Sequence, residues 1–103
     1  MTQGKHLDQN KPKLQLLPLE TLYPLAQVLE YGEGKYGTNN WQHGINYSRI
    51  FGSILRHLFT WWLGDDLDNE SGLPHLAHAA VNILFLIYYS SYKVEFDDRT
   101  NNL

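Results

Sequence analysis

Apolar residues recur every three or four positions along three stretches of the chain. These stretches cover about residues 18–31, 47–63 and 74–92. Such spacing places the apolar side chains on one face of a helix. No segment alternates between apolar and polar residues for long, and residues 92–98 offer only a weak strand candidate. The pattern predicts an all-α fold, a small helical bundle of about three main helices.

Turn and capping residues predict where these helices begin and end. Gly32 suits the end of the first helix, and Pro24 inside it predicts a bend or a late start. Ser48 can cap the start of the second helix, and Gly64 can end it.

The two ends of the chain are polar. Residues 1–13 are predicted to form a loosely held arm, and residues 94–103 a polar, acidic tail. No internal repeat or linker divides the sequence, so we expect residues 1–103 to form a single domain.

Composition excludes several classes of protein. The chain has 103 residues, a formal net charge of −3 and no cysteine. It therefore has no disulfide, thiolate metal site or cysteine nucleophile, which suits a reducing compartment. Eight basic against eleven acidic residues argue against binding a nucleic-acid polymer. The longest apolar run, residues 79–89, is too short to span a bilayer, and residues 1–17 do not resemble a signal peptide. We expect a cytoplasmic protein that does not bind membranes.

Aromatic residues make up 14% of the chain. Three helices with so many large apolar side chains have more apolar surface than one small core can bury. We therefore expect a homo-oligomer, a dimer or a higher assembly, that completes the bundle and has its site near the interface.

The second predicted helix carries a narrow polar band on an otherwise apolar surface. The band consists of Arg49, Ser53, Arg56 and Thr60, with His57 beside it. Two interpretations stay open. The band faces water, or it lines a cavity in which two guanidiniums and an imidazole make an anion site.

A similar stripe follows the third predicted helix, where His75, His78 and Asn82 share one face. Burying three polar side chains is costly unless they find partners. The stripe is therefore either a set of hydrogen-bonded core residues or part of a functional site.

An acidic connector joins these two helices. It carries four carboxylates, Asp65, Asp66, Asp68 and Glu70. The connector is either a solvated loop or a divalent-cation site, completed by His75 or His78.

Residues 31–37 contain three glycines in a G-x-G-x-x-G pattern. No strand precedes them, so the match to a dinucleotide-binding motif is weak. As a loop, the segment would offer backbone amides and the charge of Lys35 to a ligand, with Asn40 and Trp41 following. The alternative is a glycine-rich helix end and turn that needs no ligand.

Several of these segments form an ordered set. They are K-P-K-L-x-L-L-P at 11–18, Y-G-x-x-K-Y-G-x-x-N-W at 31–41, R-H-L at 56–58, G-D-D-x-D-x-E-S-G at 64–72 and H-L-A-H-A-x-x-N at 75–82. Together they resemble the phage-encoded N-terminal domain of dATP/dGTP diphosphohydrolases, over about residues 8–90. The resemblance implies a small α-helical domain distantly similar to MazG-like pyrophosphohydrolases, which cleave a nucleoside triphosphate to the monophosphate and pyrophosphate.

The first functional hypothesis is therefore an enzyme that hydrolyses a purine (deoxy)nucleoside triphosphate with Mg²⁺ or Mn²⁺. His75 and His78 are its candidate catalytic residues, as base or metal ligand. The candidate nucleotide-binding residues are Lys13, Lys35, Tyr36, Asn40, Trp41, Arg49, Arg56, His57, Trp61 and Asn82. The candidate metal ligands are Asp65, Asp66, Asp68 and Glu70.

The sequence departs from the MazG-like pattern at its carboxylate pairs. Those enzymes hold Mg²⁺ with E-x-x-E on one helix and E-x-x-D on the next. Here Glu30 and Glu33 straddle Gly32, which is predicted to end the helix, and the third helix has His75 and His78 where carboxylates are expected. Either the metal is held differently or catalysis has been lost.

Two further hypotheses follow from this departure. One is a non-catalytic protein that sequesters a nucleotide immune signal, such as a cyclic oligonucleotide or a cyclic ADP-ribose derivative, to counter host antiphage defence. The other is an oligomeric helical scaffold whose polar stripes only satisfy each other.

Overall fold

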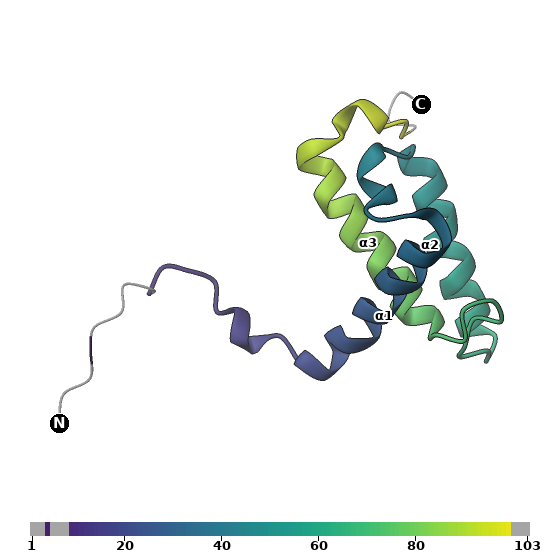
Figure 1. The fold of residues 1–103 in the computed structure, drawn as a ribbon, viewed down its shortest axis with the longest axis horizontal. Helices are drawn as coiled ribbons and strands as arrows, with labels where there is room; N and C mark the ends of the chain where they lie inside the picture. The colour runs from purple at the N-terminus through teal and green to yellow at the C-terminus, as the bar shows by residue number, and fades with distance from the viewer. Residues whose placement is uncertain (1–3, 5–8, 100–103) are drawn as a thin grey trace.

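The computed structural model describes residue 4 and residues 9–99. It contains three α-helices, α1 (Leu19–Tyr36), α2 (Tyr47–Trp62) and α3 (His75–Tyr92) (Figure 1). Three short 3-10 turns accompany them, η1 (Leu14–Leu16), η2 (Asn40–His43) and η3 (Val94–Phe96). No strand forms within these residues. The predicted all-α fold with three main helices is confirmed.

The helices α2 and α3 pack side by side in opposite directions and are joined at one end by the connector, residues 63–74 (Figure 1). The main core lies between them and consists of Tyr47, Ile50, Ile54, Ala79 and Tyr89. A smaller core, Val28 with Ala77 and Val81, fixes α1 against α3. Only the second half of α1 therefore belongs to the bundle. The segment before it projects away from the other helices (Figure 1), and its leucines are exposed.

The first helix is longer than the sequence predicts. It begins at Leu19 in spite of Pro24, so the predicted late start is wrong. It also continues through Gly32 and ends at Gly37, where φ is +93°. The weak helix propensity of glycine is overridden because Val28 packs against α3 ahead of the glycines and Lys35 pairs with Glu70 of the connector after them. A three-glycine loop that offers its amides to a ligand is therefore wrong. The alternative of a helix end and turn holds only for Gly37, because Gly32 and Gly34 lie inside α1.

The N-terminal cap of α2 and the C-terminal segment also differ from the predictions. Asn46, not Ser48, precedes α2, and the Asn46 side chain makes no capping hydrogen bond. The backbone N–H and the hydroxyl of Ser48 donate instead to the two carboxylate oxygens of Asp98, at 2.9 and 2.5 Å. Phe96 packs against the main core, so residues 94–98 form a 3-10 turn and a tether rather than a strand or a free tail.

Among the helices described, none is both long and apolar enough to cross a membrane.

Candidate functional site

Residues from all three helices line one open cavity of about 830 Å³. It lies between the second half of α1, the turn η2, one face of α2, the connector and α3. Cavities of this size are typical of sites that bind small molecules. Most of the residues singled out by the sequence line it: Lys35, Tyr36, Asn40, Trp41, Arg49, Arg56, His57, Asp68, Glu70, His78 and Asn82. The polar stripes of α2 and α3 thus meet at a shared cavity.

The remaining predicted site residues lie outside this lining. Lys13 is exposed and directly precedes η1, in the segment before α1. Trp61 lines a separate apolar groove on α2. Asp65 and Asp66 are exposed in the connector, and His75 is buried at the start of α3.

Two guanidiniums on α2 face the cavity. Arg49 and Arg56 lie seven positions apart, which is about two helical turns. Within residues 9–99, neither forms an ion pair with a carboxylate. Their charges are therefore available to an anionic ligand.

The third cation of the cavity is already paired. Glu70 accepts hydrogen bonds from the Tyr31 hydroxyl, at 2.7 Å, and from the Lys35 ammonium. The bond from Lys35 lowers the pKa of Glu70, and the bond to Glu70 raises the pKa of Lys35 and of Tyr31. The pair fixes the connector to α1 at the rim of the cavity. Tyr31 also lines the cavity. It is absent from the candidate binding residues predicted from the sequence, although it belongs to the 31–41 motif.

Asp68 organises the connector from inside. One of its carboxylate oxygens accepts hydrogen bonds from the backbone N–H groups of Glu70, at 3.1 Å, and Ser71, at 2.8 Å. Partial burial alone would raise the pKa of Asp68, but the bonds from Ser71 and the nearby histidines outweigh it, and the pKa is lowered. The backbone hydrogen bonds of the connector thus hold the Asp68 carboxylate in place.

Three histidines from α2 and α3 contact one another. The rings of His57 and His78 are stacked, with centroids 4.7 Å apart and an interplanar angle of 7°. The Nδ1 atoms of His57 and His75 lie 2.9 Å apart, and Nε2 of His78 lies 2.7 Å from the Ser71 hydroxyl. Burial is the main cause that lowers the pKa of both His57 and His78, so both rings are neutral at pH 7.

The stripe of α3 is completed by Asn82, which bridges to α2. Its side-chain amide donates to the Ser53 hydroxyl, at 3.2 Å, and to the carbonyl of His78, at 3.0 Å. The partially buried polar residues are therefore hydrogen-bonded, and they also remain at the cavity wall.

Trp41 and Tyr36 differ in how much of their rings a ligand could contact. Trp41 is stacked on Phe85, with centroids 4.9 Å apart, and meets Tyr88 edge-on at 4.8 Å. Much of its ring therefore belongs to the core. The Tyr36 side chain is 61% exposed at the end of α1, so its ring is the more accessible of the two.

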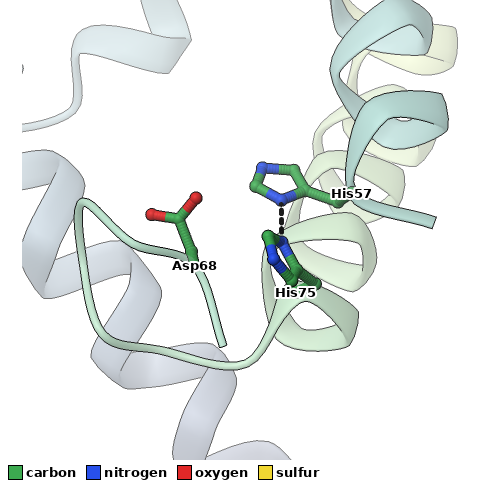
Figure 2. A group of neighbouring side chains, drawn as sticks. All are labelled: His57, Asp68 and His75. Carbon is green, nitrogen blue, oxygen red and sulfur yellow. Dashed lines mark hydrogen bonds between the residues drawn. The ribbon is translucent and has the colours of Figure 1, made fainter. Parts of the chain in front are cut away.

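The structure does not gather the four connector carboxylates at one point, because Asp68 bonds to the loop backbone and Glu70 turns toward α1. The one group of three potential metal ligands in the described chain is His57, Asp68 and His75, whose ligand atoms lie within 4.8 Å of one another (Figure 2). Mg²⁺ and Mn²⁺ prefer oxygen ligands, so two imidazoles and one carboxylate are not the donor set expected for either.

Glu30 and Glu33 lie differently from the sequence prediction. Because α1 continues to Tyr36, the two residues do not straddle a helix end but share one helix, three positions apart. Both line the cavity, and within residues 9–99 neither side chain is ion-paired. Glu30 and Glu33 are therefore a second place, besides the group around Asp68, at which carboxylates could bind a cation.

Taken together, the described residues form a small helical domain with one cavity, lined by two guanidiniums of α2. The chain belongs to the family described as dATP/dGTP diphosphohydrolase, N-terminal, which matches residues 1–99. It is 36% identical over 96 residues to a dATP/dGTP diphosphohydrolase of Salmonella phage PMBT28. That alignment covers 93% of this chain but 33% of the relative, so the chain spans about a third of the relative's length. No solved structure matches the chain significantly, and the likeness to MazG-like enzymes stays a prediction.

Proposed function

We propose that the cavity binds a purine deoxynucleoside triphosphate and that the protein hydrolyses it to the monophosphate and pyrophosphate. The observation that carries the proposal is the pair Arg49 and Arg56, which face a nucleotide-sized cavity without carboxylate partners. The name of the phage relative supports the substrate class.

The residues of the cavity suit the different parts of such a substrate. The two guanidiniums on α2 would bind the phosphates, since paired N–H donors match phosphate oxygens. The exposed ring of Tyr36 would stack on the purine, a contact worth about 1–3 kcal/mol for a base on an aromatic side chain. The amide of Asn40, also at the cavity wall, would hydrogen-bond the base or sugar.

Hydrolysis requires water to attack the α-phosphorus while the bond to the β-phosphate oxygen breaks and pyrophosphate leaves. His57 and His78 are neutral and line the cavity, so either can take the proton of the attacking water. Mg²⁺ is commonly held by one or two carboxylates together with substrate phosphates, and Glu30 and Glu33 fit that role. When bound, the ion would neutralise charge that develops on the phosphates.

A second candidate function is binding without turnover. The donors at the cavity are favourable for a phosphorylated ligand, but α3 carries His75 and His78 where the MazG-like resemblance implies a second carboxylate pair. On this proposal the protein sequesters a nucleotide signal, such as a cyclic oligonucleotide or a cyclic ADP-ribose derivative.

One experiment separates the two functions. The purified protein is incubated with dATP, dGTP and cyclic nucleotides, with and without Mg²⁺ or Mn²⁺, and the products are separated by chromatography. Metal-dependent release of monophosphate and pyrophosphate supports the enzyme. Ligand recovered intact after heat denaturation supports sequestration.

The arginine pair is tested by direct binding measurements. We expect Arg56→Ala to weaken nucleotide affinity at least about tenfold, because one charged hydrogen bond is lost. Arg99→Ala is the matched control, since Arg99 pairs with Asp97 outside the cavity. Equal affinity of Arg56→Ala and the control would overturn the proposed binding mode.

A further inference from the structure

Three elements bring one potential metal ligand each to the same point. His57 comes from α2, Asp68 from the connector and His75 from the first turn of α3 (Figure 2). One ligand atom of each lies within 4.8 Å of the others. The three residues are separated by up to 18 positions in the chain, so their convergence is a property of the fold.

The two imidazoles are already close to the separation of two ligands on one ion. Their Nδ1 atoms lie 2.9 Å apart. Two nitrogens bound tetrahedrally to zinc at its usual bond length are separated by about 3.3 Å. A small shift of either ring would therefore admit the ion in place of the single hydrogen between the nitrogens. One oxygen of Asp68 is not used by the bonds to the connector backbone and is left for the ion.

An independent feature of His75 also indicates a ligand. The residue is only 5% exposed, and its Nε2 atom is buried without a hydrogen-bond partner. The nearest carboxylate oxygen, from Asp65, is 3.7 Å away, too far for a hydrogen bond. If Nδ1 binds a metal, the ring proton must be on Nε2, where it points toward Asp65. Metal-bound histidines usually donate their second N–H to such a carboxylate.

We propose that His57, His75 and Asp68 bind one zinc-like divalent transition-metal ion, with Asp65 positioning His75. The donor set favours this class over Mg²⁺, because imidazole suits zinc, iron and nickel. Three protein ligands leave a fourth position open, and His57 and Asp68 both line the cavity, so that position faces the space where a ligand would bind. The site does not depend on the proposed function, since the ion binds the protein alone.

The test uses the tag-free full chain after treatment with a chelator. Zn²⁺ is titrated by calorimetry in the absence of nucleotide, native mass spectrometry gives the stoichiometry, and Co²⁺ serves as a spectroscopic probe of the ligand geometry. We expect one ion per chain and a rise in the melting temperature. His57→Ala and Asp68→Ala should each weaken Zn²⁺ affinity about 100-fold or more, because a direct ligand is lost. His43→Ala, which removes an exposed histidine in η2, should bind like the unchanged chain.

Asp65→Asn keeps the three ligands but weakens the support of His75, and we expect it to reduce affinity about 10–100-fold. Each variant is first checked for unchanged helicity without metal, so that a folding defect is not mistaken for loss of a ligand. If Zn²⁺ does not bind, or binds His57→Ala and Asp68→Ala as tightly as the His43→Ala control, the proposed site is overturned. The titration contains no nucleotide, so failure to bind Zn²⁺ overturns the metal site and leaves the proposed hydrolysis standing, with His57 then free to act as a base.

Discussion

His78 illustrates how polar side chains are accommodated in so small a protein. Its ring stacks on His57, its Nε2 atom contacts Ser71, and its carbonyl accepts a bond from Asn82. Burial lowers the pKa of both stacked rings, so the stack does not bring two charges together. The ring is thus both held in the structure and able to accept a proton at neutral pH.

At the other end of α2, the contact between Ser48 and Asp98 has a defined pH dependence. The hydrogen bonds from Ser48 hold the pKa of Asp98 below its ordinary value. A carboxyl group whose pKa is lower in the folded state stabilises the fold above its unfolded pKa, and this stability is lost as the pH falls through the folded pKa. We expect Asp98→Ala to lower the melting temperature at pH 7 and the difference from the unchanged chain to shrink below pH 4.

Circular dichroism melts of both proteins between pH 7 and pH 2.5 measure this effect. Glu95→Ala, an exposed carboxylate of the same segment, is the control. A difference that stays constant over the whole range would show that Asp98 acts through packing rather than through its charge.

At the scale of elements, the sequence predicts the helices well and their ends less well. The start of α2 and the end of α3 agree with the apolar spacing, because both helices bury one face in the main core. The end of α1 does not agree, because contacts with α3 before Gly32 and the pairing of Lys35 with Glu70 of the connector after it hold this segment in the helix. Such contacts are between segments distant in sequence and leave no local signal.

Two glycines should respond in opposite ways to alanine. Gly44 has φ of +108°, and a Cβ atom there would lie 2.1 Å from the Phe96 ring. Gly34 lies inside α1, with no heavy atom within 4 Å of the added Cβ. We expect Gly44→Ala to lower the free energy of unfolding by about 2–4 kcal/mol, through strain and overpacking. Gly34→Ala should raise it by about 0.5–1 kcal/mol, through helix propensity.

Urea denaturation of the two variants checks this pair. If Gly44→Ala is as stable as the unchanged chain, Phe96 does not pack against Gly44. The C-terminal segment would then not be anchored at the core in the way described.

At the scale of the whole molecule, the cavity was partly predictable. The polar stripes on two otherwise apolar helices leave a cavity as one of two interpretations, and Arg56 and His78 do line one. The pairing of Lys35 with Glu70 was not predictable, because it depends on how Asp68 folds the connector. The convergence of His57 with His75 likewise needed the packing of α2 on α3, which the separate stripes do not specify.

Many large apolar side chains are exposed on the outer surface, and we propose that a second copy of the chain covers them. Phe59 and Trp62 are 65% and 76% exposed on α2, and Leu16 is 77% exposed on the projecting segment, which points away from its own bundle (Figure 1). Each molecule therefore carries an uncovered groove and an uncovered apolar segment. Exposed apolar surface of this kind favours association.

Light scattering coupled to size-exclusion chromatography tests the association. We expect an oligomer at micromolar concentration, and the double variant Phe59→Glu, Trp62→Glu should be a monomer with unchanged helicity. A monomeric unchanged chain would contradict the proposal. Tyr92→Glu, an exposed aromatic position at the end of α3, is the matched control.

Arg56 borders two surfaces at once, the polar cavity on one side and the apolar groove with Phe59 and Trp62 on the other. On the proposed binding mode, a phosphate that immobilises this guanidinium would also change the wall of the groove. Occupancy and self-association would then be thermodynamically linked, and each would alter the equilibrium constant of the other by the same factor. The apparent affinity for the ligand would then depend on the protein concentration, so the amount of protein present would change the fraction that has ligand bound.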